Sequence, residues 1–379
     1  MDLQSFAPSW RQCVIALGWA ILALLGAAAP VRAADNTGLG PLSVRNQFPV
    51  TLRFLSYTPD APATLPGGTV QLRYQFELTN TFVNTQSPLA NNGPVIDSTR
   101  LQGPPLDPAT DFPATGYGVY IDVESRRNLL RLDYGLFDSL ELGLELAWVS
   151  FGGGFLDSRI EGVERFFGGL NVDRPYAPRD RFDFYVTRDA GTSNAFLIGS
   201  STPISNVMQD PVASLKWNLS EGGDVLPALT VKLSYKKPLE RQPSGDRALV
   251  SSGGADSGYY FLISKAVGDV VGHIQFGTTH LEVQPNTFAD TLRHRMFGLE
   301  FRLDAENSLL VQSVTQSSIF LRSNMPGTPD FDISRPTDVM VLGYKHVGSW
   351  LFELGTLEDY NQQRNESDIT FYFQTGWRW

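Results

Sequence analysis

Apolar and polar side chains alternate along most of this chain, and that period of two constrains the fold more than any other feature. In residues 139–150, SLELGLELAWVS, the leucines share one face and the glutamates lie on the other. The same alternation runs through residues 70–79, 229–236 and 297–303. In a soluble sandwich, a second sheet would have to cover each apolar face. The repeated pairing of charged rows with bulky apolar rows therefore predicts an all-β fold. We expect an antiparallel transmembrane β-barrel, apolar toward lipid and polar toward a lumen.

Short connections alternate with long ones along the chain, which is typical of barrels with tight periplasmic turns and long outer loops. An even number of strands places both termini on the periplasmic side. Residues 182–203 are ambiguous, because they can form either an extra hairpin in an outer loop or two further wall strands. The remaining pattern predicts 12 strands, at 69–83, 117–136, 139–151, 206–219, 228–237, 258–267, 270–283, 293–304, 308–320, 337–346, 349–357 and 368–379.

Residues 1–33 have the features of an export signal. Arg11 precedes an uncharged stretch at 14–29, and Val31 and Ala33 are the small residues that signal peptidase requires, so cleavage is expected after Ala33. The alternative is an uncleaved anchor, but the apolar stretch is short for a membrane span. The only cysteine, Cys13, lies in this segment, which excludes disulfides and zinc–thiolate sites from the mature protein.

The charge balance and the motifs exclude several functional classes. Removal of residues 1–33 changes 40 acidic and 30 basic residues to 39 and 28, a net charge of −11, which argues against nucleic acid as a partner. No nucleotide-binding, zinc-protease or serine-hydrolase motif is present in the sequence. His280 and His294 flank one expected outer loop and could form a metal pair, but solvated histidines are the simpler interpretation. We therefore expect no cofactor, no metal and no enzymatic activity.

The chain ends in ITFYFQTGWRW, with Phe371, Phe373, Trp377 and Trp379 on one face of the last expected strand. Aromatic rings of this kind are favoured at a membrane interface. This ending resembles the assembly signal of Gram-negative outer-membrane barrels, although Phe is the usual last residue there. The resemblance implies that the barrel-assembly machinery is a partner and that outer-membrane lipid and lipopolysaccharide surround the barrel.

A second resemblance rests on three stretches: residues 40–59, GPLSVRNQFPVTLRFLSYTP; residues 122–146, DVESRRNLLRLDYGLFDSLELGLEL; and residues 152–168, GGGFLDSRIEGVERFFG. They are similar to a proteobacterial family, a domain of unknown function expected to be an outer-membrane protein. This resemblance implies no activity and no functional residues.

The charged residues predicted to face the lumen are the main candidates for function. Acidic and basic groups are about equal in number, whereas an ion-selective pore would show a ring of one sign. Two interpretations remain open: internal ion pairs that fill the barrel, and a polar path for a solute. The candidates are Arg73, Asp122, Glu124, Arg131, Asp133, Glu141, Glu145, Lys216, Lys232, Lys236, Glu300 and Arg302.

Two further segments could govern passage. Residues 34–67 precede the barrel, expected at 68–379, and their prolines and apolar residues suggest a plug inside the lumen. An extra pair of wall strands and a periplasmic contact are the alternatives. Residues 158–170 have a helical apolar face and form either a packed loop or a gate. The functions left open are passive passage of a small or amphipathic solute, a structural or surface-interaction barrel, and an outer-membrane lipid-modifying enzyme.

Overall fold

The computed structural model describes residues 37–86, 95–103, 105–156, 178–193, 195–283, 287–321, 333–359 and 367–379. The expected export signal at 1–33 and the expected helix at 158–170 lie outside these residues. Within the described part of the chain, no helix is both long and apolar enough to cross a membrane. The short helices are η1 (Thr51–Arg53), α2 (Ser98–Leu101) and α4 (Asp246–Val250).

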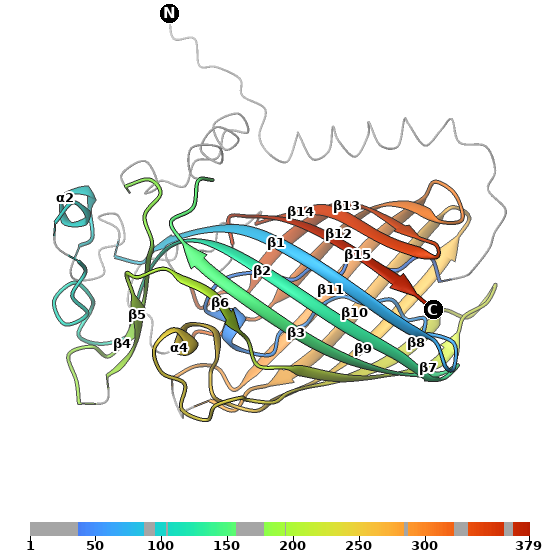
Figure 1. Cartoon of the computed structure of the whole chain (residues 1–379), viewed down its shortest axis with the longest axis horizontal. Helices are drawn as coiled ribbons and strands as arrows, with labels where there is room; N and C mark the ends of the chain where they lie inside the picture. The colour runs from blue at the N-terminus through green and yellow to red at the C-terminus, as the bar shows by residue number, and fades with distance from the viewer. Residues whose placement is uncertain are drawn as a thin grey trace, which may run out of the picture.

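The described strands form a closed antiparallel barrel, which lies on its side in Figure 1. Closure comes from β1, which pairs with β2 on one side and with β15, the last strand, on the other. Three of the 15 strands are additions at one end, and the other 12 form the wall, as the alternation predicts. The wall strands are β1 (Val70–Asn84), β2 (Tyr117–Phe137), β3 (Leu140–Gly152), β7 (Val212–Glu221), β8 (Ala228–Lys236), β9 (Asp256–Val267), β10 (Val270–His280), β11 (Thr291–Arg302), β12 (Asn307–Gln316), β13 (Thr337–Val347), β14 (Trp350–Asp359) and β15 (Ile369–Arg378).

The three additional strands are β4 (Asp183–Arg188), β5 (Phe196–Ser200) and β6 (Ile204–Met208). The ambiguous stretch 182–203 forms the β4–β5 hairpin, which pairs with the first residues of β2 and does not widen the barrel. The strand expected at 206–219 is divided. Its first part, β6, pairs with the end of β3, and β7 pairs with the beginning of β3. Pro211, which lies between them, has no N–H to donate to a continuous ladder.

The outer face of the wall is apolar, as predicted. In β3, Leu142 and Leu144 are about 40% exposed, while Glu141 is buried on the inner face. In β15, Phe371 and Trp377 point outward, and Tyr372 and Gln374 are buried inside. Both strands follow the period of two without a break, so the outward row forms an apolar surface around the wall.

The two ends of the barrel differ. At the short-turn end, two-residue turns join β2 to β3, β9 to β10 and β13 to β14, and the main chain of Trp379 is hydrogen-bonded to that of Val70. At the long-loop end lie the β4–β5 hairpin, α2 and α4 (Figure 1). An apolar cluster closes this end and includes Tyr117, Phe288 and Phe320, whose rings pack at 5.1–6.3 Å.

Candidate functional site

Residues 37–67, here called the interior segment, run through the lumen. The residues from Leu42 to Tyr57 are all buried, although none belongs to a strand. The segment contacts inward side chains of β11 to β14 on one side of the barrel and of β2, β3, β7 and β8 on the other. It is therefore enclosed by the wall, and Figure 1 shows it in blue within the ring of strands.

The interior segment is a hairpin with two arms. The rising arm starts beside Glu300, near the short-turn end of β11, and reaches Ser367, just before β15, at the long-loop end. The tip, at 48–54, packs into the apolar cluster of the long-loop end. The falling arm returns past Lys232 of β8 to Glu141, near the short-turn end of β3.

Polar wall residues bind the main chain of the rising arm. Glu300 accepts hydrogen bonds from the N–H groups of Leu39 (2.9 Å) and Gly40 (3.2 Å). The side-chain amide of Gln312 forms two bonds with the main chain of Leu42, at 2.9 and 3.0 Å. Glu353 accepts from the N–H of Ser43 at 3.0 Å. Each of these bonds satisfies a buried main-chain group that has no strand partner.

The tip supplies the apolar residues that the sequence indicated would need cover. Phe48 and Val50 are fully buried, and Leu52 and Phe54 are each 3% exposed. Phe54 packs edge-on against Phe288 at 5.5 Å. Burial of a side chain of this size contributes roughly 1.5–3 kcal/mol, so the tip fixes the hairpin at the long-loop end.

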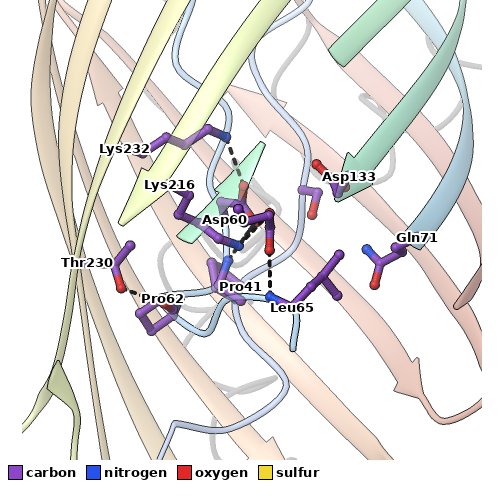
Figure 2. Close-up of polar contacts among 12 residues, drawn as sticks. Pro41, Asp60, Pro62, Leu65, Gln71, Asp133, Lys216, Thr230 and Lys232 are labelled. Carbon is purple, nitrogen blue, oxygen red and sulfur yellow. Dashed lines mark hydrogen bonds and ion pairs between the residues drawn. The ribbon is translucent and has the colours of Figure 1, made fainter. Parts of the chain in front are cut away.

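Asp60 of the falling arm is the centre of a cluster of buried charges (Figure 2). Its carboxylate accepts from Arg131 at 2.7 Å and from the ammonium of Lys232 at 2.9 Å. Lys216 lies 3.8 Å away and pairs more closely, at 3.0 Å, with Glu141. Figure 2 shows Lys216 and Lys232 reaching toward Asp60 from the wall.

The interior segment completes the charge balance of this cluster. The wall contributes four cations, Arg73, Arg131, Lys216 and Lys232, and three anions, Asp133, Glu141 and Glu145. Arg73 and Arg131 both bind Asp133, at 2.5 and 2.7 Å. The fourth anion is Asp60. These seven wall groups carry one excess positive charge, which Asp60 offsets; a buried charge is costly unless it is paired.

Other inward charges also bind the segment or one another. Lys236 binds the carbonyl of Arg53 and pairs with Asp256, each at 2.9 Å, and Lys345 binds the carbonyl of Pro41 and pairs with Glu353, each at 2.9 Å. Arg302 lies at the short-turn end, where its guanidinium donates to the carbonyl of Gly268.

The expectation that Asp122 and Glu124 face the lumen is wrong. Strand residues alternate, and both lie on the opposite face of β2 from Arg131 and Asp133, with no bulge between them. Glu124 instead accepts from the N–H groups of Phe155 and Leu156 at 2.9 and 3.1 Å, which anchors the chain that follows β3.

His280 and His294 do not converge on a common site. His294 is buried on the inner face and bonds to Thr279, whereas His280 is on the outer face of β10, so the two rings point to opposite sides of the wall. His273 contacts Glu300 at 3.0 Å within the lumen. Among the described residues, no group of three or more potential metal ligands occurs.

The alternation could not identify every residue of the site. Asp60 lies in the non-periodic stretch YTPDAP, and its only signal was a carboxylate in a segment expected to enter a charged lumen. Gln312 and Gln275 bind the segment's main chain but carry no charge. Polar neutral residues on inward positions were the signal that could have revealed them.

Comparison with known proteins places the chain in a family. Among curated proteins, no sequence matches this chain. Of the solved structures, the COG4313 outer membrane channel from Pseudomonas putida F1 is similar at 10% identity, covering 86% of this chain and 100% of that chain with a TM-score of 0.49. The translocator domain of autotransporter NalP from Neisseria meningitidis is similar at 8% identity, covering 83% and 90%, with a TM-score of 0.39. A family profile matches residues 114–379, from just before β2 to the end of β15. The chain therefore belongs to the family described as "Protein of unknown function (DUF3187)".

Proposed function

We propose that this protein is an outer-membrane channel for passive passage of a small or amphipathic solute, and that the interior segment holds it closed. The observation that carries the proposal is the occupation of the lumen by a separate hairpin of chain. Twelve strands enclose more space than the eight that wall side chains can fill, and less than an open porin of 16 strands. The hairpin occupies that surplus space.

The way the segment is held favours a removable closure. No strand ladder joins it to the wall within the described residues, and its main chain is bound by side chains such as Glu300, Gln312 and Lys345. Water can replace each such partner if the segment withdraws, because an exposed carboxylate or amide is readily hydrated. The wall left behind would be polar and almost neutral, which suits a weakly selective path.

The proposed location follows from the outward apolar face. Outer-membrane lipid and lipopolysaccharide would contact this face, and the barrel-assembly machinery would read the aromatic last strand. The proposed function requires neither a catalytic residue nor a cofactor.

Planar-bilayer recording tests the proposal. The intact protein should conduct poorly, and a variant lacking residues 35–60 should form a larger, weakly selective pore because the lumen loses its contents. Heat-modifiable mobility on gels verifies that the shortened barrel is folded.

A tethered variant is the matched control. The hydroxyl of Ser56 donates to the side chain of Gln316 at 2.9 Å, so the double change Ser56→Cys, Gln316→Cys brings two thiols close enough for a short bifunctional thiol reagent. Bridged protein should stay closed under every condition that opens the unbridged form. A folded barrel without 35–60 that conducts no better than the intact protein rejects the channel and favours the structural or surface-interaction barrel.

A further inference from the structure

Two arginines lie on the outward face of β11, in line with apolar side chains of the wall. Arg293 and Arg295 are both exposed, and they share one face because they are two positions apart in the strand. Phe297 and Leu299 continue this outward row toward the short-turn end and are 58% and 46% exposed. The outward row therefore changes from apolar to basic between Phe297 and Arg295, close to the long-loop end of the strand at Thr291.

The strands on both sides of β11 also become polar at this level. On β10, Arg295 is opposite Phe276, an exposed ring, and Arg293 is opposite Thr278. On β12, Arg295 is opposite Thr315. The two guanidinium groups are thus flanked by hydroxyl groups and border an apolar surface on the short-turn side. In a barrel that spans a membrane, this border is where the acyl chains of a lipid meet its headgroup.

The wall offers these two arginines no counter-charge. Neither guanidinium has a hydrogen-bond or ion-pair partner in the part of the chain that the structure describes. No outward residue of β9, β10 or β11 is acidic, and Asp338, two strands away on β13, is bound to a hydroxyl of β12 at 2.6 Å. Arg126, an outward arginine of β2, differs because Glu124 lies 3.5 Å from it.

The spacing of the pair suits one phosphate group. Residues two apart in a strand have Cα atoms about 7 Å apart, so two long side chains can close on the same anion. A guanidinium donates two parallel N–H bonds to phosphate oxygens. A phosphate monoester carries a charge of about −2, which matches two arginines better than the single charge of a carboxylate does.

We propose that Arg293 and Arg295 bind a phosphate of a lipid in the leaflet at the long-loop end, with the acyl chains of that lipid against Phe276, Phe297 and Leu299. In the outer leaflet of an outer membrane, this lipid is lipopolysaccharide, whose lipid A part carries phosphates next to its acyl chains. The inference rests on the proposed location of the protein and not on the channel.

Native mass spectrometry of the intact protein in a neutral detergent tests the site without any measurement of conductance. The probes are diphosphoryl lipid A, the same lipid A after dephosphorylation, and inorganic phosphate. Diphosphoryl lipid A should bind roughly tenfold more tightly than the dephosphorylated form, which is the effect of two exposed ion pairs. Affinities within about threefold of each other overturn the inference. Displacement of lipid A by an equal concentration of inorganic phosphate would assign the arginines to a free anion and overturn the choice of a lipid.

Matched variants assign the effect to the pair. The double variant Arg293→Gln, Arg295→Gln should weaken diphosphoryl lipid A roughly tenfold and leave the dephosphorylated form unchanged. Arg126→Gln removes an outward arginine that already has a carboxylate, so it should change neither affinity. An equal loss in Arg126→Gln, or an equal loss of both lipids in the double variant, contradicts the assignment.

A chelator separates the arginines from a bridging metal. Binding should persist in EDTA, because arginine and not a divalent cation neutralises the phosphate, and its loss in EDTA would overturn the inference. A barrel that conducts after removal of residues 35–60 but shows no preference for phosphorylated lipid A rejects this site and leaves the channel standing. The preference without conductance does the reverse.

Discussion

Replacement of Asp60 by Asn should release the interior segment from the wall. The change keeps the shape of the side chain but removes the charge that binds Arg131 at 2.7 Å and Lys232 at 2.9 Å. Loss of one partner from a buried pair costs about 3–5 kcal/mol, and Asn retains an acceptor oxygen, so we expect about 3 kcal/mol. Since 1.4 kcal/mol corresponds to a factor of ten, the open fraction should rise roughly 100-fold.

Thiol modification measures this fraction directly. A cysteine in place of Ser56, which is 8% exposed, should react with a water-soluble methanethiosulfonate only when the segment leaves the lumen. The reaction rate should therefore rise about 100-fold in the Asp60→Asn background. Glu306→Gln, in the exposed turn between β11 and β12, is the matched control and should leave the rate unchanged.

Replacement of Lys232 by Met should partly reverse the effect of Asp60→Asn on the modification rate. Without Asp60 the wall cluster has one excess positive charge, and Lys232→Met removes it. The double variant Asp60→Asn, Lys232→Met should therefore react more slowly than Asp60→Asn alone. A folded Asp60→Asn protein whose modification rate stays within threefold of the parent would show that the pairs at Asp60 do not hold the segment.

Two more predictions concern the wall and its assembly. Cysteines in place of Leu142 and Leu233 should react with lipid-soluble labels, and cysteines in place of Glu141 and Lys232 should not; equal labelling of both pairs would contradict the assigned faces. Deletion of Trp379 should lower the amount of heat-modifiable barrel in the outer membrane and increase its periplasmic degradation, and a normal yield of folded barrel would exclude a role in assembly.

The wall was predictable from the sequence because successive residues of a barrel strand face outward and inward in turn, and each side requires a different kind of side chain. Leu142 faces outward and Glu141 faces the lumen, and this alternation continues for as long as the outward side of the strand is uncovered. The alternation fails at the long-loop end, where loops cover the outward face of a strand. Asp122 and Glu124 lie in that part of β2, and the carboxylate of Glu124 binds the main chain of the loop that covers it instead of facing the lumen.

The contents of the lumen were less predictable. Residues that bind an irregular main chain have no period, so nothing in the sequence pairs Gln312 with Leu42 or Glu353 with Ser43. Ion pairs were one of the two expected uses of the inward charges, beside a polar path for a solute. Glu300 and Lys345 also serve as partners for main-chain groups, a use that depends on the path of residues 37–67 and not on the residue types alone.

The order of the chain determines when the lumen can be filled. The rising arm of the interior segment is made early, yet its partners Gln312, Lys345 and Glu353 lie 270–310 residues further along. Contacts of such sequence separation form late, because the intervening chain must first be ordered. We therefore expect the rising arm to become buried only after β12, β13 and β14 are in position. Burial of the rising arm should then be no faster than the pairing of these three strands.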